Sequence, residues 1–348
     1  MKLLAALLLS LILFTWIAEP ASASSRSIQK KVLQILNSKA RQITASPSRL
    51  WNYAHWSSEH SRYEWSNRLF IMVLNHKNST YDKHEIYLNI ARNYFQMKMF
   101  KSALMYYNKV PKTSELWLMA VEERAWSKVR LGQYDQALAD TATLLSPVFS
   151  HISSPETHYL YGYINLAVCN YKNVFKNTEL FKKRHVARIS ALEKFQSRQA
   201  RGWVQGLTQK IAEKGVQEGL DRDSLALFPR FFYKYKKIRD LLRKVESSKK
   251  ASLAEILQME TLLAAYARYD LNEYRIVIKK LQLIEADVIQ RIHIDETLLG
   301  QRRWNSQEKQ VDPYALKFPF DEEDVWVDEL DNYDVRAKSC PKIMEAKL

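Results

Sequence analysis

The chain has 348 residues, of which 47% are hydrophobic and 26% charged, and its formal net charge is +15. This composition excludes a wholly disordered chain, and the length is sufficient for one elongated domain or two ordinary ones. Only 7 glycines and 9 prolines are present, whereas a many-stranded β-sandwich or barrel needs a turn about every 8–12 residues. The two cysteines cannot form a disulfide framework or a four-cysteine zinc site. The composition therefore predicts a helical protein.

The first 23 residues have the pattern of a secretory signal peptide. Lys2 precedes a 15-residue apolar run from Leu3 to Ile17, and Ala21-Ser22-Ala23 has the small side chains of a cleavage site. The run is shorter than the roughly 20 residues that a membrane-spanning helix needs. We expect cleavage after Ala23 and a mature protein that is soluble, periplasmic or otherwise exported, and not integral to the membrane.

Export bears on the two cysteines, Cys169 and Cys340. Compartments outside the cytoplasm are usually oxidising, so the two could form a disulfide. The alternative is that Cys169 is a small buried helix residue and Cys340 a thiol in the tail. Their spacing does not decide between the two, because pairing depends on geometry.

The middle of the chain repeats. Each unit has a small residue on its first helix, an aromatic residue that opens its second helix, and a small residue three positions later. The triplets are Ala91, Phe100 and Ala103; Ala125, Tyr134 and Ala137; and Gly162, Tyr171 and Val174. The second triplet follows the first by 34 residues. Small residues let the two helices of a hairpin approach closely, and Gly132 suits the turn between them. This pattern resembles the tetratricopeptide repeat family.

The resemblance implies an all-α fold, a right-handed α-α superhelix that ends in an irregular acidic and aromatic C-terminal tail. We expect a signal peptide (1–23), N-terminal helices that could include a degenerate repeat (24–84), three repeats (85–181), a basic helical region (182–304) and the tail (305–348). In the basic region we expect a long helix from Arg188 to Leu220 interrupted by glycines, and a last hairpin of helices at about 251–269 and 272–291.

In this family the first helices of the repeats line a concave groove. The family's spacing implies these lining residues here: Leu88, Arg92, Phe95 and Gln96; Met119, Glu122, Trp126, Val129 and Arg130; and Tyr159, Tyr163 and Leu166. Such an aromatic surface with two arginines suits a protein segment. The alternative is that Trp126, Tyr159 and Tyr163 are packed against the next turn of the superhelix. The carboxylate clamp of one subfamily does not carry over, because Leu88 occupies the expected lysine position.

Positive charge concentrates in residues 176–250, which hold 20 Lys and Arg against 8 Asp and Glu. We expect a basic patch at Lys182, Lys183, Arg184 and Arg188. In an exported protein the available polyanions are envelope polymers, anionic lipid surfaces and acidic proteins, and nucleic acid is not expected. The alternative is that these helices are simply well solvated.

The tail has the opposite charge: residues 312–336 contain nine acids against two basic residues. Phe320, Trp326, Leu330 and Tyr333 are too apolar for a solvated linker, so we expect them to make contacts. The tail resembles the closing segment of exported tetratricopeptide proteins of gliding and predatory delta-proteobacteria. It could cap the open end of the repeat array, or it could dock on a partner protein.

We found no catalytic motif. His55, Glu59 and His60 come nearest, but the spacing is one residue too long for a metalloprotease motif, and His60 turns away from the other two on a helix. We expect no enzyme activity, no metal and no cofactor. The sequence predicts a non-catalytic scaffold that binds protein segments of a bacterial envelope complex. The alternative is a binder of an anionic envelope polymer or membrane surface through residues 176–250.

Overall fold

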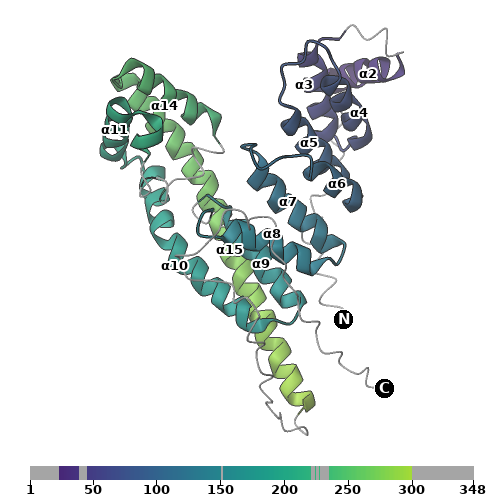
Figure 1. Ribbon diagram of the computed structural model, residues 1–348, viewed down its shortest axis with the longest axis vertical. Coiled ribbons are helices and arrows are strands. Elements are labelled where there is room, and N and C mark those ends of the chain that lie inside the picture. The colour runs from purple at the N-terminus through teal and green to yellow at the C-terminus, as the bar shows by residue number, and fades with distance from the viewer. Residues whose placement is uncertain are drawn as a thin grey trace. The chain divides into compact units, whose positions relative to one another are not determined.

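The computed structural model describes residues 23–38, 45–149, 152–220 and 235–299, together with Ser224 and Leu227 (Figure 1). These residues are almost entirely helical and include no strand, which confirms the all-α prediction. Residues 1–22, most of the expected signal peptide, and the whole tail (305–348) lie outside the described residues. No described helix is long and apolar enough to cross a membrane.

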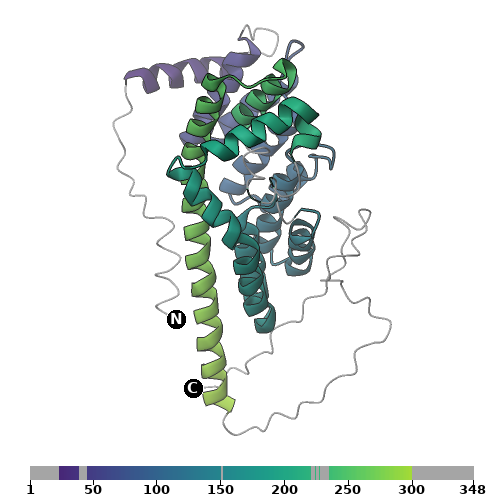
Figure 2. The ribbon, with the colours of Figure 1, turned by 90° about the vertical axis from the view of Figure 1, so that its left-hand side faces the viewer.

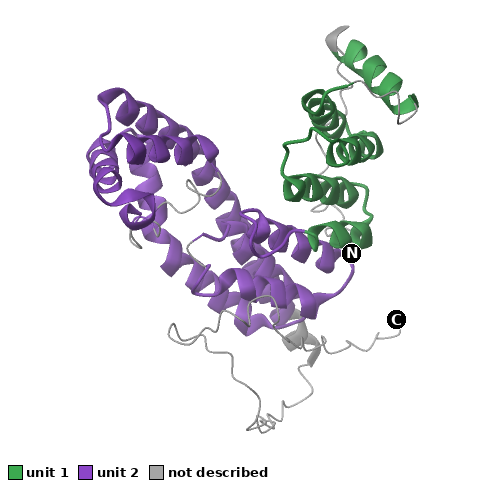
Figure 3. Ribbon diagram, turned by 45° about the horizontal axis from the view of Figure 1, so that its top comes forward, with its two compact units in different colours: residues 1–109 green, residues 110–348 purple. Residues whose placement is uncertain are grey.

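The chain divides into two compact units, residues 1–109 and 110–348 (Figure 3). The helices of the first unit are α2 (Ala23–Asn37), α3 (Pro47–Glu59), α4 (Tyr63–Leu74), α5 (Lys83–Gln96) and α6 (Phe100–Tyr107). Those of the second are α7 (Trp117–Arg130), α8 (Tyr134–Leu145), α9 (Pro155–Ala167), α10 (Tyr171–Gln196), α11 (Arg201–Gly219), α14 (Lys236–Ser248) and α15 (Leu253–Leu299). The first expected repeat therefore belongs to one unit and the next two to the other.

The repeating segments form helical hairpins whose two helices pack together: α3 with α4, α5 with α6, α7 with α8, and α9 with α10. The side chains of Ala91, Ala103, Ala125 and Ala137 are 0% exposed. At Gly162, a Cβ would lie 3.3 Å from Asn177 Nδ2 on the facing helix. Small residues thus stand where the helices approach most closely, as the sequence predicted.

The hairpin turns share one backbone conformation. In each turn the second residue after the first helix has a left-handed φ, between 58° and 72°. Its N–H and that of the following residue donate to carbonyls of the last helical turn, for example Gly132 N to Val129 O at 3.0 Å and Gln133 N to Lys128 O at 2.9 Å. This pair of hydrogen bonds is the Schellman motif. The left-handed residues are Ser61, Lys98, Gly132 and Cys169.

The C-terminal helices are arranged differently from the expectation. We expected a hairpin of helices at about 251–269 and 272–291, but α15 is one continuous helix of 47 residues. No glycine or proline occurs between Leu253 and Leu299, so nothing in the backbone chemistry stops the helix. Figure 2 shows α15 running beside α10, and it also packs against α9, α11 and α14.

The structure also has two helices, α10 and α11, where we expected one long helix from Arg188 to Leu220. α10 ends at Gln196, and Arg198, with a φ of 58°, turns the chain into α11. Gly202 and Gly206 lie inside α11, whereas Gly215, with a φ of 85°, interrupts its helical geometry. The N–H of Val216 that this kink frees donates to Glu246 Oε1 of α14 at 2.8 Å.

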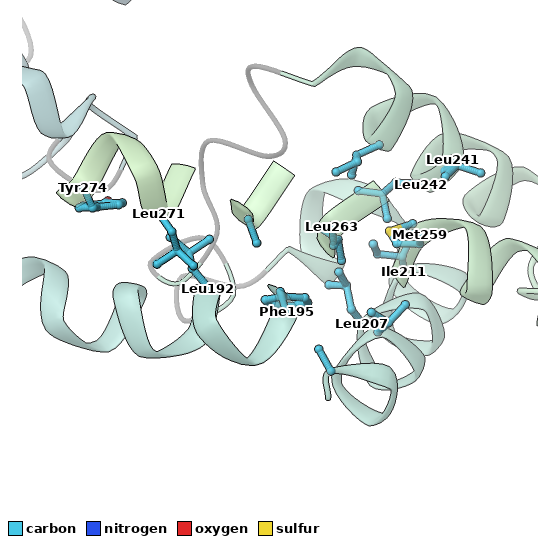
Figure 4. Packing of buried hydrophobic residues seen from close by; sticks show 14 of the residues in the cluster. Leu192, Phe195, Leu207, Ile211, Leu241, Leu242, Met259, Leu263, Leu271 and Tyr274 are labelled. Carbon is cyan, nitrogen blue, oxygen red and sulfur yellow. The ribbon is translucent and has the colours of Figure 1, made fainter. Parts of the chain in front are cut away.

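A single apolar core joins these C-terminal helices. Figure 4 shows Leu192 and Phe195 of α10, Leu207 and Ile211 of α11, Leu241 and Leu242 of α14, and Met259, Leu263, Leu271 and Tyr274 of α15. All of them are buried. The predicted boundary at residues 181 and 182 lies within α10, whose Phe181 belongs to this same core.

Candidate interaction surfaces

The twelve residues expected to line one groove are divided between the two units. In the first unit, Arg92 and Phe95 are half-buried and Gln96 is exposed on α5. Leu88 is 2% exposed and so is not a surface residue. This correction has a simple cause: α5 packs against both α4 and α6, so it has little free face.

In the second unit, two more predicted lining residues, Val129 of α7 and Leu166 of α9, are each 7% exposed and belong to the interior. Val129 packs with Ala125 and Ala137, and Leu166 with Val174. Of the remaining residues, Arg130 is exposed. Those that are half-buried are Met119, Glu122, Trp126, Tyr159 and Tyr163.

Three of these half-buried residues form an aromatic cluster between α7 and α9. The ring centroid of Trp126 lies 5.8 Å from that of Tyr159 and 6.1 Å from that of Tyr163, and the two tyrosines are 6.3 Å apart. Lys280 Nζ of α15 lies 4.4 Å from the Tyr159 ring centroid. Burial raises the pKa of Tyr159, and the neighbouring Tyr163 and Glu156 raise it further, so its hydroxyl stays protonated. The cluster combines packing with partly exposed aromatic surface.

The predicted basic patch is corrected at one position. Lys182 and Lys183 are exposed on α10, and Arg184 is half-buried and donates to Leu145 O at 3.1 Å. Arg188 is only 5% exposed, and its guanidinium donates to the hydroxyl of Tyr274 at 3.2 Å. It lies one turn beyond Arg184 on the face that packs against α15, so it is an interior residue.

Arg188 belongs to a buried polar cluster that sequence reasoning missed. The Tyr274 hydroxyl that it reaches also lies 3.2 Å from His185 Nδ1. Beside it, His158 Nδ1 donates to Asn177 Oδ1 at 2.8 Å, and the two histidine rings are 5.3 Å apart. Burial lowers the pKa of His158 to about 4, so the ring is neutral at pH 7. The cluster joins polar side chains of α9, α10 and α15 in the interior.

A second missed feature is a buried carboxylate in the α7–α8 hairpin. Asp140 is 2% exposed and accepts two bonds from Arg124, at 3.1 and 2.6 Å. Lys128 Nζ lies 2.8 Å from its Oδ2 atom. Arg124 and Lys128 are four residues apart on one face of α7, a spacing that could have signalled a shared partner.

The histidines of the first unit do not form a metal site. The His55 ring contacts the rings of Trp51 and Phe70, with centroid distances of 4.6 and 5.2 Å, and burial lowers the pKa of His55. His60 stacks on Trp56 and bonds to its carbonyl at 2.8 Å. Across the described part of the chain, no group of three histidine, cysteine or acidic side chains could hold a metal ion.

The expected tail contacts, Phe320, Trp326, Leu330 and Tyr333, lie outside the described residues. Cys169 is disulfide-bonded, so the alternative of a buried free thiol is excluded for this residue. Cys340 is outside the described residues.

The chain matches no known protein-family model, and no curated protein is significantly similar to it. Its functional assignment therefore rests on its own residues.

Proposed function

We propose that the protein is an exported, non-catalytic scaffold of the tetratricopeptide type, and that the aromatic cluster of α7 and α9 binds a protein segment of an envelope complex. The observation that carries this proposal is the arrangement of Trp126, Tyr159 and Tyr163. Their rings are held by packing and yet remain partly exposed. Rigid aromatic side chains give contact area at low entropic cost, which is why they dominate binding hot spots.

The repeat assignment is supported by the shared turn geometry and the buried alanines of the hairpins. Arg130, exposed at the end of α7, adds a cation beside the aromatic surface. The aromatic cluster and Arg130 together suit a protein segment that has apolar side chains and a carboxylate. The right-handed superhelix belongs to this proposal, as does secretion after cleavage at Ala23.

The test places a photo-cross-linking residue at Arg130 and, as a control, at the exposed Gln136 of α8. We expect a cross-linked partner from position 130 in intact cells, and its loss when Trp126→Ala and Tyr163→Ala are added. Phe175→Ala, which removes a partly exposed aromatic residue of α10, is the matched control. A cross-link that survives the Trp126 and Tyr163 substitutions in a folded protein would refute the site.

A second function, binding to an anionic polymer or membrane surface, is favoured by the lysines of α10 and α14. Lys182, Lys183, Lys236 and Lys237 are exposed, while Ile238 and Leu242 hold the opposite face of α14 in the core. Reversal of the four lysines to glutamate should abolish binding to heparin or to vesicles containing phosphatidylglycerol. Raising the salt concentration should do the same, because such binding is screened. Arg188 is unsuitable for this test, since its reversal would disturb the interior.

A further inference from the structure

Cys169 fixes one end of a covalent link. It is the left-handed residue of the α9–α10 turn, with a φ of 58°, and it is disulfide-bonded. The sequence contains one other cysteine, Cys340, so no other residue of the same chain can be its partner. A bond between them would link the tail covalently to the α9–α10 turn.

The α9–α10 turn lies beside the C-terminal half of α15. Leu166 and Val174, on either side of the turn, pack in one cluster with Ile284 and Val288. The Arg291 guanidinium also interacts with the Tyr171 phenol. Figures 1 and 2 both show α15 alongside α9 and α10. A Cys169–Cys340 bond would therefore bring residue 340 beside the C-terminal half of α15.

The outward face of α15 near this point is apolar and basic. Ile276, Leu283 and Ile289 are 44%, 59% and 59% exposed. Arg275 and Lys279 are exposed among them, while the two acids between 275 and 293, Glu285 and Asp287, are half-buried and Asp287 pairs with Arg291. Ile276 and Leu283 are seven residues apart and so lie on the same side of the helix, and large aliphatic side chains exposed together in this way are typical of a surface that another segment covers.

The tail has the complementary composition. Residues 312–336 carry nine acids against two basic residues, and the acids are interspersed with Trp326, Leu330 and Tyr333. Apolar side chains would cover the aliphatic residues of α15, and the carboxylates would meet Arg275 and Lys279. The lysine-rich helix α10 is a less complementary surface for the tail than α15, because Phe175 and Val186 are its only exposed large apolar residues.

The distances allow this contact. Tyr333 lies seven residues before Cys340, and Trp326 lies fourteen residues before it. Even in a fully extended chain, these two residues can therefore be at most about 24 and 48 Å from the disulfide. From Val288 back to Ile276, α15 extends about 18 Å. A segment tethered this close has an effective concentration on the order of millimolar, which favours even weak contacts.

We propose that residues 318–334 pack on the outward face of α15, over Ile276, Leu283 and Ile289, and that a Cys169–Cys340 disulfide holds them there. The tail then covers the apolar face of the second unit with its own chain. This inference is independent of the aromatic cluster and of any partner.

The first experiment digests the unreduced protein and identifies cross-linked peptides by mass spectrometry. We expect one disulfide-linked pair that contains Cys169 and Cys340. Two free thiols, or disulfide-linked peptides that pair a labelled with an unlabelled chain in an isotopically mixed sample, would overturn the proposal. The second outcome would show that the bond joins two copies.

The second experiment uses a carbodiimide, which couples lysines to carboxylates in contact. We expect Lys279 to couple to acids within 321–334, and we expect Leu283→Glu to reduce this coupling about tenfold. Val186→Glu, at a residue of α10 that is 66% exposed, is the matched control and should leave it intact. Coupling of the tail to Lys182 and Lys183 instead would refute docking on α15.

Circular dichroism tests whether both variants fold. Should Leu283→Glu unfold, Ile289→Gln at an equally exposed position replaces it, with the same expected loss of coupling. Unchanged coupling of Lys279 to the tail in a folded variant contradicts the proposed contact.

Discussion

The hairpins formed by α3 to α8 and the C-terminal helices α10, α11, α14 and α15 are all-helical, yet different contacts hold the two regions together. In the hairpins, each helix packs on the other helix of its pair, and the polar contact between Arg124 and Asp140 joins residues 16 apart. In the C-terminal helices, Arg188 of α10 bonds to Tyr274 of α15 across 86 residues, and Glu273 of α15 accepts a hydrogen bond from Ser154, the residue before α9, across 119 residues. The first arrangement can form locally, whereas the second needs distant segments to meet.

The largest expected effect concerns the buried carboxylate of the α7–α8 hairpin. Asp140→Ala leaves Arg124 and Lys128 without their shared partner, and we expect a loss of about 3–5 kcal/mol in the free energy of unfolding. Asp287→Ala removes a half-buried pair with Arg291 on a single helix, α15, and should cost less than about 0.5 kcal/mol. Urea unfolding of both variants measures the difference. Equal effects would mean that the hairpin does not depend on this local pair.

The continuity of α15 is tested by Asn272→Pro. Asn272 is exposed, so the substitution affects the backbone and removes no packing. In the middle of a helix, proline should cost about 3 kcal/mol or more. Asn272→Ala is the control and should be neutral or slightly stabilising. If the proline variant were as stable as the control, α15 would not be continuous at Asn272, and the hairpin expected from the sequence would be favoured instead.

The pH dependence of stability tests the polar cluster at α9, α10 and α15. The pKa of His158 is about 4 in the folded protein, against 6.5 when unperturbed. Between these values the unfolded chain binds a proton that the folded protein excludes. This contribution is therefore complete above pH 6.5 and is lost as the pH falls to about 4, up to about 3 kcal/mol. His158→Gln should flatten this slope in denaturation curves measured from pH 7 to 4; an unchanged slope would assign the effect to other groups.

The smallest effects compare two hairpin turns that have the same backbone conformation. Gly132 has a φ of 72° and an added Cβ would meet no atom within 4 Å, so Gly132→Ala should cost about 1 kcal/mol through the backbone alone. Lys98, with a φ of 60°, carries a side chain in the same conformation, so Lys98→Gly should stabilise by up to about 1 kcal/mol. Thermal unfolding would show opposite shifts in melting temperature. Shifts of the same sign would contradict a shared turn geometry.

Much of the hairpin region could be predicted from the sequence. Ala91, Ala103, Ala125 and Ala137 identified the close helix contacts, because small residues that recur at a 34-residue step are typical of helices that pack in repeated pairs. The residues of the candidate binding site were harder to predict from the sequence. Family spacing identified Trp126 and Tyr163 as partly exposed, but Leu88, Val129 and Leu166 proved to be interior. An apolar residue at helical spacing fits a groove and a core equally well.

The sequence by itself determined the helical class, the hairpin register and the opposite charges of body and tail, because these depend on composition and on contacts between neighbours. Only the tertiary structure decided that Arg188 is buried against Tyr274 and that α15 is a single helix along α9 and α10. The same holds for the disulfide at Cys169. Whether a charge is solvated or buried depends on segments about a hundred residues away, and local periodicity carries no information about which of them meet.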